Sequence, residues 1–133
     1  MLFRSFVGSS AGYSNTTGLY NIAIGQQALQ ANTTASNNTA VGYQAGYSNT
    51  TGTPNTYIGY LAGYNGTTGS DNTAVGRAAG ISNSTGSRNT FIGSDSGNGV
   101  ANSVHSDNVG VGYRTFYNVS TGSGNVEIGR AHV

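Results

Sequence analysis

The side chains that could take part in chemistry are few, and several of them lie close together in one stretch of the chain. The 133 residues include five Arg, no Lys, three Asp, one Glu, two His and no Cys. The segment GSDSGNGVANSVHSDNVGV, residues 93–111, contains Asp95, His105 and Asp107 among Asn and Ser side chains. Carboxylate and amide oxygens can bind a cation, and a His with an Asp and a Ser can form a hydrolytic triad.

The spacing of these residues argues against catalysis and metal binding. Asp95 and Asp107 do not have the spacing of an EF-hand loop, and zinc would find only His105 and His132. Ser is frequent throughout the chain, and no nucleophile elbow frames one. The paired carboxylates that glycoside cleavage usually requires are missing. We therefore predict no enzymatic activity, no cofactor and no metal site, and we interpret residues 93–111 as a solvated loop.

A second candidate chemistry is the binding of sugar rings by Tyr side chains. Tyr43, Tyr60 and Tyr113 occupy equivalent places in the repeat described below. Stacked Tyr rings on a flat face could bind a glycan. The alternative is that these rings cover a backbone corner or line a seam between subunits. The candidate ligand surface consists of Tyr43, Tyr60, Tyr113, Asp95, His105 and Asp107.

The elements that position these residues follow from an internal repeat. The segment NTAVGYQAGYSNTTG, residues 38–52, matches NTAVGRAAGISNSTG, residues 72–86, at eleven of fifteen positions. A pair formed by Val or Ile and Gly recurs every seventeen residues, with one interval of nineteen. We number the positions of each repeat from this Gly, which is position 1. The repeat extends along the chain and predicts a single domain over residues 1–133. Its coils begin at Gly8, Gly25, Gly42, Gly59, Gly76, Gly93 (the irregular coil of 19 residues), Gly112 and Gly129 (partial).

A seventeen-residue unit rich in Gly, Asn and β-branched residues opposes helix and favours short strands joined by turns. We predict an all-β fold, a parallel β-solenoid or β-roll of seven to eight coils. One strand should end at position 17, and a second should lie near positions 4 to 9. Since strand side chains alternate, we expect positions 15 and 17 to face the core and position 16 to be free. The predicted core is Val7, Ile24, Val41, Ile58, Val75, Ile92, Val111 and Ile128.

Position 14 is always Asn, which predicts a ladder of side-chain amides along the stack of coils. The alternative is that Asn is present only as a turn residue that tolerates left-handed backbone angles. The residues concerned are Asn21, Asn38, Asn55, Asn72, Asn89, Asn108 and Asn125.

The composition limits both the core and the partners. Leu, Ile, Val and Phe together make up 24 of 133 residues, so the interior of each coil is thin, and packing of several copies would bury a second surface. The formal net charge of +1 leaves no basic surface for nucleic acid. No apolar run approaches the length needed to insert into a membrane.

The motif N-T-A-V-G-Y-Q-A-G resembles the head repeats of trimeric autotransporter adhesins, which carry an Asn-x-x-aliphatic-Gly signature, and still more the repeats of phage tail fibres. The resemblance implies a left-handed β-roll, a homotrimer, an extracellular or virion-associated location, and a host glycan or cell-surface receptor as partner. The implied function is that of a stiff stalk or head that presents a host-binding surface. Adhesin head repeats are nearer fourteen residues, so the turns should differ.

Two alternative functions remain. The chain begins and ends inside repeats, so we expect either a fragment of a longer fibre or the subunit of an extracellular filament that stacks head-to-tail through uncapped ends. It could also be an ice-binding solenoid, because Thr recurs at positions 10 and 15. Ice binding requires an outward Thr array, and the core face predicted for position 15 argues against it. The Thr residues are Thr17, Thr34, Thr51, Thr68 and Thr85, then Thr39, Thr56, Thr73 and Thr90.

Overall fold

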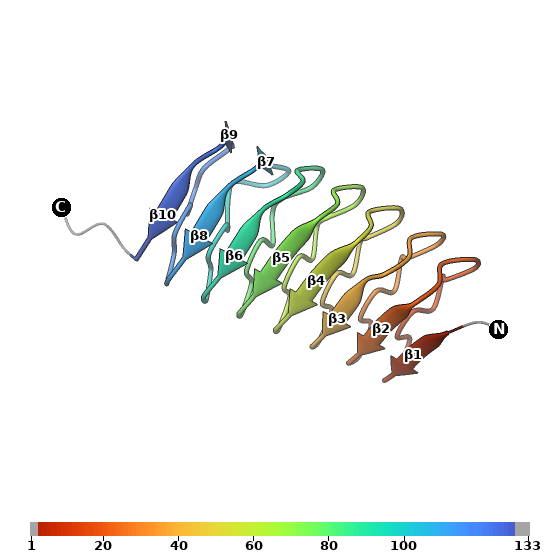
Figure 1. Cartoon of the computed structure of the whole chain (residues 1–133). Coiled ribbons are helices and arrows are strands. Elements are labelled where there is room, and N and C mark those ends of the chain that lie inside the picture. Colours follow the sequence, from red (N-terminus) through yellow and green to blue (C-terminus); the bar gives the residue numbers. More distant parts are fainter. Residues whose placement is uncertain (1–2, 130–133) are drawn as a thin grey trace.

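The chain winds into a rod of stacked coils, with one long parallel sheet along its side (Figure 1). This computed structural model describes residues 3–129. Eight strands form the long sheet in the order β1-β2-β3-β4-β5-β6-β8-β10, and β7 pairs with β9. The bounds are β1 Arg4–Val7, β2 Asn21–Ile24, β3 Thr39–Val41, β4 Asn55–Ile58, β5 Asn72–Val75, β6 Thr90–Ile92, β7 Val104–Ser106, β8 Val109–Val111, β9 Thr121–Ser123 and β10 Val126–Ile128. The predicted all-β parallel solenoid is confirmed.

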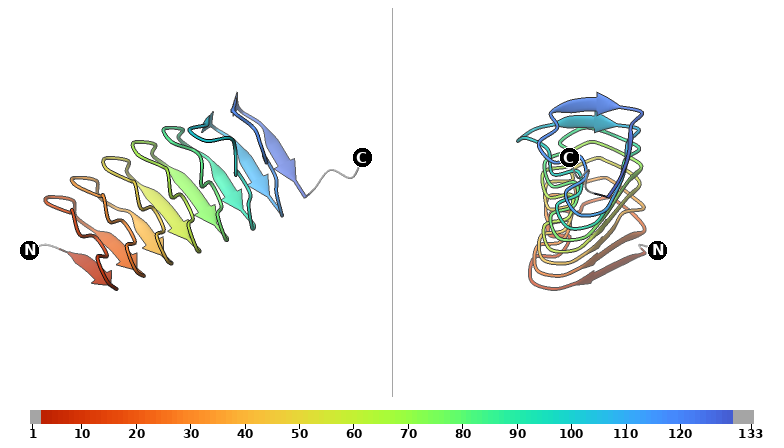
Figure 2. Two further views of the ribbon diagram at one scale, coloured as in Figure 1. Left: turned by 180° about the vertical axis from the view of Figure 1, so that it is seen from behind. Right: turned by 90° about the vertical axis from the view of Figure 1, so that its left-hand side faces the viewer.

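Each strand pairs with its copy in the next coil, at the same position of the repeat. Thr39 pairs with Thr56, and Val41 pairs with Ile58, seventeen residues further along. Where the chain holds the longer coil, Thr90 pairs with Val109, so the two extra residues leave the strand register unchanged. The view along the stack in Figure 2 shows the coils following one another with nearly the same outline.

The predicted second strand at positions 4 to 9 is wrong, because this side of the coil consists of hydrogen-bonded turns. Gln27 and Leu29 have φ values of 60° and 49°, and alternating left-handed residues of this kind cannot form an extended strand. The backbone still bonds from coil to coil: Gly12 N–H donates to the Ala28 carbonyl at 2.9 Å. The turns therefore stack as regularly as the strands.

The prediction of the core face is also wrong, because position 16 faces inward and positions 15 and 17 face outward. Ala23 and Ala40 are completely buried, whereas the Ile24 and Ile58 side chains are 41% and 39% exposed. Asn21 and Asn38 at position 14 are buried and bonded between coils, so the alternation of strand side chains directs position 16 inward and positions 15 and 17 outward. The residues predicted as core, Val7, Ile24, Val41, Ile58, Val75, Ile92, Val111 and Ile128, are exposed or half-buried on the outer face.

Large and small side chains alternate within the core. Where position 16 holds Tyr57, the residue six places later is Gly63, and a Cβ built on Gly63 would lie 2.3 Å from the Tyr57 ring. The order is reversed where Gly110 is followed by the buried Phe116. The strand and the turn of a coil therefore share one space, which a large side chain of the same coil fills in five of the seven pairs; beside Gly46 and Gly80 the rings of Tyr57 and Phe91 from the next coil lie close. The pairs are Phe6/Gly12, Ala23/Leu29, Ala40/Gly46, Tyr57/Gly63, Ala74/Gly80, Phe91/Gly97 and Gly110/Phe116.

The Asn side chains at position 14 form a ladder along the rod, with one break. Asn38 N–H donates to Asn21 Oδ1 at 2.9 Å, and Asn21 Nδ2 donates to the Ala35 carbonyl of the next coil at 2.7 Å. Equivalent links to the preceding Asn side chain are made by the backbone N–H groups of Asn72, Asn89, Asn108 and Asn125. Asn38 Oδ1 has no partner, so the ladder is interrupted before Asn55.

A second Asn row, at position 8, was not predicted. Asn32 Nδ2 donates to Asn15 Oδ1 at 2.8 Å, and Asn49 Nδ2 donates to Asn32 Oδ1 at 3.2 Å. The next coil has Gly66 at this position, beside the Tyr57 hydroxyl, and Asn49 Oδ1 is left without a partner. The seventeen-residue spacing of Asn15, Asn32 and Asn49 was a sufficient signal for this row.

Candidate functional site

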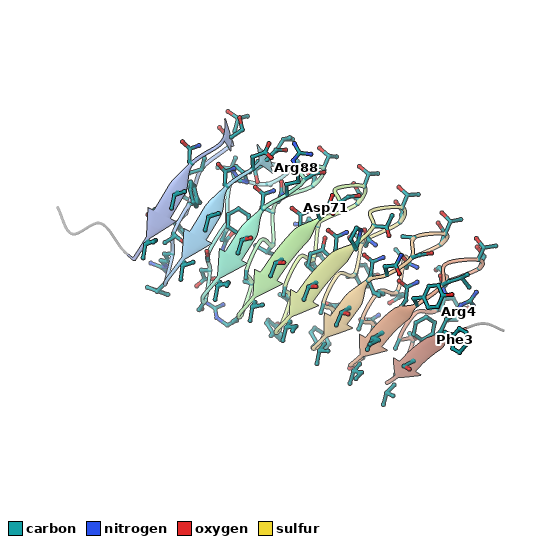
Figure 3. All side chains as sticks on the ribbon, in the orientation of Figure 1. Phe3, Arg4, Asp71 and Arg88 are labelled. Carbon is teal, nitrogen blue, oxygen red and sulfur yellow. The ribbon has the colours of Figure 1, made fainter. Side chains whose placement is uncertain are left out.

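The outward side chains at positions 15 and 17 of the long sheet form a continuous surface, which we call the outer sheet face. No member of this face is charged, and its exposed side chains include Ile22, Ile24, Ile58 and Ile92. Side chains project from this side of the strands along the whole rod (Figure 3). The position 15 members are Ser5, Ile22, Thr39, Thr56, Thr73, Thr90, Val109 and Val126, and the position 17 members are the eight Val and Ile residues named above.

Tyr side chains form two short stacks on successive coils. The rings of Tyr43 and Tyr60 lie 5.4 Å apart at 13°, and those of Tyr47 and Tyr64 lie 5.0 Å apart at 15°. The rings therefore contact their neighbours along the rod, and each covers part of the next. The second pair was not predicted, although its spacing of seventeen residues indicates the same stacking.

Tyr113 does not extend these stacks. Two coils separate it from Tyr60, and Arg77 and Ser94 hold the same position in them. Its ring contacts Arg114, whose guanidinium carbon lies 5.0 Å from the Tyr113 centroid. The structure thus brings together two of the three predicted Tyr residues.

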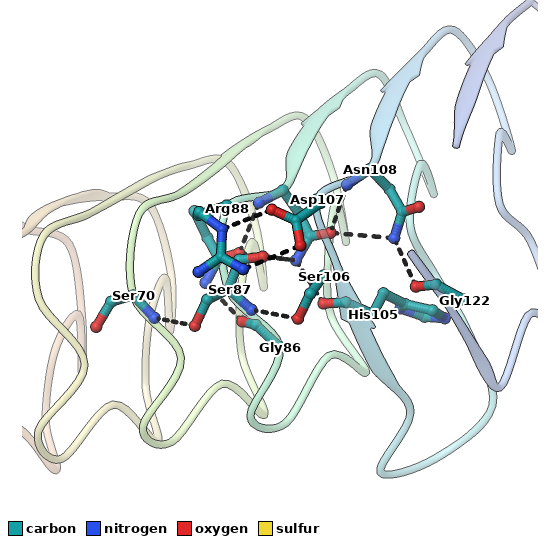
Figure 4. A network of polar contacts seen from close by, with 11 residues as sticks. Ser70, Gly86, Ser87, Arg88, His105, Ser106, Asp107, Asn108 and Gly122 are labelled. Carbon is teal, nitrogen blue, oxygen red and sulfur yellow. Dashed lines mark hydrogen bonds and ion pairs between the residues drawn. The ribbon is translucent and has the colours of Figure 1, made fainter. Parts of the chain in front are cut away.

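The charged residues of the irregular coil do not share a site. Asp95 is buried and forms an ion pair with Arg77 of the preceding coil. Asp107 is exposed and accepts two hydrogen bonds from Arg88, at 2.5 and 2.9 Å (Figure 4). Within residues 3–129, no group of three His, Cys, Asp or Glu side chains could hold a metal ion.

The Arg88–Asp107 pair shifts the pKa values of both partners by direct contact. The hydrogen bond from Arg88 holds the pKa of the Asp107 carboxyl below its ordinary value, and the same bond raises the pKa of Arg88. Both pairs connect the coil that begins at Gly76 with the irregular coil, so they fasten the first of the two junctions at which coil length changes in the described part of the chain.

The interpretation of residues 93–111 as a solvated loop is wrong. The stretch forms a complete coil that contains β7, and the His105 side chain is only 1% exposed. Asp95 and His105 are therefore not part of a ligand surface. The two extra residues enlarge the coil instead of forming a loop on its surface. His132, the other histidine weighed for zinc, and Arg130 lie outside the described residues.

Two further features bear on binding. Burial raises the pKa of the Tyr57 hydroxyl, and the hydrogen bond with the Asn72 side chain acts in the opposite direction, so this phenol stays protonated inside the rod.

The hollow lined by Phe3, Arg4, Tyr20 and Ile22 lies at the first described coil, and no other described coil covers it. Within the described residues, no helix is long and apolar enough to cross a membrane.

The outer sheet face is therefore the surface feature that extends along all eight strands of the long sheet and on which an interaction could be built. It is apolar, uncharged and repeated without interruption through β8 and β10, whereas the Tyr stacks span two coils each. Comparison of the chain with protein-family models, with curated proteins and with solved structures finds no match.

Proposed function

We propose that this chain is a structural fibre or adhesin module, a stiff stalk or head of a phage tail fibre or cell-surface adhesin, in which three copies pack through their outer sheet faces. The observation that carries the proposal is the outer sheet face itself. Its Val7 and Ile128 side chains are 60% and 78% exposed, and the Ile side chains between them are about 40% exposed in the single chain. Soluble monomers rarely expose a large contiguous apolar surface.

The composition of the rod supports the same proposal. Residues 5–70 contain no charged side chain, so copies could approach along this half of the rod without burying an unpaired charge. The backbone of each coil is hydrogen-bonded to its neighbours, which suits a load-bearing element. The resemblance to adhesin and tail-fibre repeats supports three copies, an extracellular or virion-associated location, and a host receptor or glycan as the final partner.

Light scattering coupled to size-exclusion chromatography tests this proposal. At micromolar concentration we expect a mass three times the 13.5 kDa of the chain. Circular dichroism of the same fractions should show a β-rich spectrum. A folded species of 13.5 kDa would contradict the proposal, because the outer sheet face would then be stable in water.

A second candidate function, ice binding, is favoured by one observation. The Thr39, Thr56, Thr73 and Thr90 side chains lie in a row on the outer sheet face, in register and about 4.8 Å apart from coil to coil. Methyl groups of Val and Ile flank this row, so the face is a regular grid of hydroxyl and methyl groups. The argument that these Thr residues face the core does not hold in this structure.

Thermal hysteresis separates the two functions. An ice-binding protein would be a monomer that slows ice growth, and T56L/T73L would abolish the effect. A trimer that buries the Thr row would show none. We place the fibre module first because Ile and Val outnumber Thr on the face and replace it at both ends of the rod.

A further inference from the structure

The strands of the long sheet are short, so the outer sheet face has an edge at each end of every strand. The residue at position 13 precedes each strand, and these residues make up what we call the first edge. The residues at positions 2 and 3 follow each strand and make up the second edge. Asp71 precedes β5 and Arg77 follows it, and both residues are exposed. Each strand therefore places members of both edges at the same height along the rod.

Most charges of the chain lie on these two edges. Six of the nine charged residues belong to them, and all six flank β5, β6 or β8. Along the first edge the signs alternate as negative, positive and negative, at Asp71, Arg88 and Asp107. Asp71 and Arg88 project from the side of the rod where β5 and β6 begin (Figure 3). The first edge therefore has a pattern of charge and not merely a net charge.

The second edge carries the opposite sequence of signs. Positive, negative and positive charges follow the same three strands, at Arg77, Asp95 and Arg114. Arg77 and Arg114 are exposed, whereas Asp95 is buried and paired with Arg77. At each of these strands, the two ends thus carry charges of opposite sign.

The ion pairs within the chain leave each edge with one net charge. The pairs described above each lie along one edge and neutralise two of its three charges. The charge that remains is Asp71 on the first edge and Arg114 on the second. Asp71 is exposed and has no ion pair among the described residues. The Arg114 guanidinium lies 5.0 Å from the Tyr113 centroid, on an exposed side chain. The two edges are therefore complementary in net charge as well as in pattern.

The width of the outer sheet face suits three copies around one axis. Arg77 follows Asp71 by six residues, which span about 20 Å of extended chain. Three faces of this width closed into a triangle lie about 6 Å from the axis, close to the half-spacing of about 5 Å between packed sheets. Four faces would lie about 10 Å from the axis, too far for Val and Ile side chains to meet. In a ring of three, the first edge of each copy meets the second edge of the next.

Resting on the trimer proposed above, we propose that these edges hold three parallel copies in register. The first edge of one copy lies against the second edge of its neighbour at the same height. Asp71 then faces Arg77, and Asp107 faces Arg114, in contacts between exposed side chains. At β6, between these two contacts, the edges again carry opposite signs.

A shift by one coil brings like charges together. In one direction Asp71 faces Asp95 and Arg88 faces Arg114, and a shift in the other direction also sets like charges against each other at two strands. An antiparallel copy would lay the first edge against itself. Specific interfaces exclude wrong arrangements by such repulsion. The coils of residues 5–70 are uncharged and similar to one another, so the charged edges are what distinguishes one register from the next.

Disulfide trapping tests the register in the full chain, which contains no Cys. Asn37 precedes β3 and Tyr43 follows it, so N37C/Y43C leaves all six charges unchanged. The two sites are about 20 Å apart in one chain, so a disulfide can only join different copies. Oxidation should convert N37C/Y43C to covalent trimers on non-reducing denaturing gels. The matched variant N37C/S9C, whose sites lie two coils or about 10 Å out of register, should stay uncrosslinked.

Charge reversal tests the cause of the register. D71R places two Arg side chains together at each of the three seams of a trimer. The association constant of the trimer should therefore fall about tenfold or more at low salt and recover at about 1 M NaCl. The control T51R, which adds a positive charge to an exposed turn of an uncharged coil, should show neither effect. Sedimentation equilibrium measures both variants.

The outcomes separate this proposal from the proposed function. A monomeric wild type would overturn both the fibre module and the register. A trimeric wild type in which N37C/S9C is trapped as well as N37C/Y43C, or in which neither is trapped, would overturn the register alone. A trimer that D71R and T51R weaken equally would do the same.

Discussion

At the scale of single residues, the strand and the turn of a coil share one space, which Tyr57 fills from the strand and Leu29 fills from the turn. Y57A should remove about 3 to 5 kcal/mol of unfolding free energy by leaving a cavity. G63L alone should also destabilise, because its side chain would collide with the Tyr57 ring.

The double variant Y57A/G63L recreates the Ala23/Leu29 pair of an earlier coil, and Leu29 already adopts a left-handed φ of 49°. It should therefore be more stable than the sum of the single changes by about 1 to 3 kcal/mol. Urea denaturation of the four proteins measures this coupling. Strict additivity would show that strand and turn do not share one space.

The Arg88–Asp107 pair predicts a limited acid response. Because the pKa of Asp107 is lowered in the folded chain, the pair stabilises above the ordinary Asp pKa of about 3.9, and its contribution disappears as pH falls through the lower, folded value. Between pH 5 and 2.5 the Tm of D107N should fall less than that of the wild type. D71N is the control, since Asp71 acts on Arg88 only through its charge. An equal fall in wild type and D107N would refute the assignment.

At the scale of elements, the Asn ladder joins the coils as much as the sheet does. Asn72 Oδ1 accepts hydrogen bonds from Asn89 N–H and Nδ2, and Asn72 Nδ2 donates to the Gly86 carbonyl at 2.9 Å. N72A would leave these buried groups without partners, at about 1 to 3 kcal/mol for each. Asn38 Oδ1 has no partner in the structure, so N38A should cost less. Chemical denaturation measures the free energy of unfolding of N72A and of N38A. Equal losses of unfolding free energy in the two variants would contradict the role of the ladder.

The repeat predicted much of the fold, but not which side of each strand faces inward. Period, parallel pairing and the Asn ladder follow from residues that recur every seventeen places. The alternation of Thr, Ala and Val in β5 defines two faces and is equally compatible with either being inside. The buried Asn side chains at position 14 decide between them, because position 16 lies on the same side of the strand and positions 15 and 17 lie on the other. His105 was misplaced because an insertion can enlarge a coil as well as form a loop.

At the scale of the whole molecule, the two faces of the long sheet have different roles. The inner face packs Ala and aromatic side chains inside the coils, and the outer sheet face carries the Val and Ile side chains of position 17. A core of this size contributes little hydrophobic free energy for each ordered residue. We therefore expect the stability of the rod to depend on protein concentration, because association buries the outer sheet face. The Tm should rise as the chain is concentrated, and a constant Tm would indicate a self-sufficient monomer.

The central claim is that the outer sheet face joins copies of this chain. The most direct test is the mass, by sedimentation equilibrium, of the wild type, of I58D/I92D on that face, and of T51D/T68D, which places the same charges on exposed turns. We predict trimers for the wild type and for T51D/T68D, and a monomer for I58D/I92D that keeps its β-rich circular dichroism. A monomeric wild type, or a trimer that survives I58D/I92D unchanged, would contradict the claim.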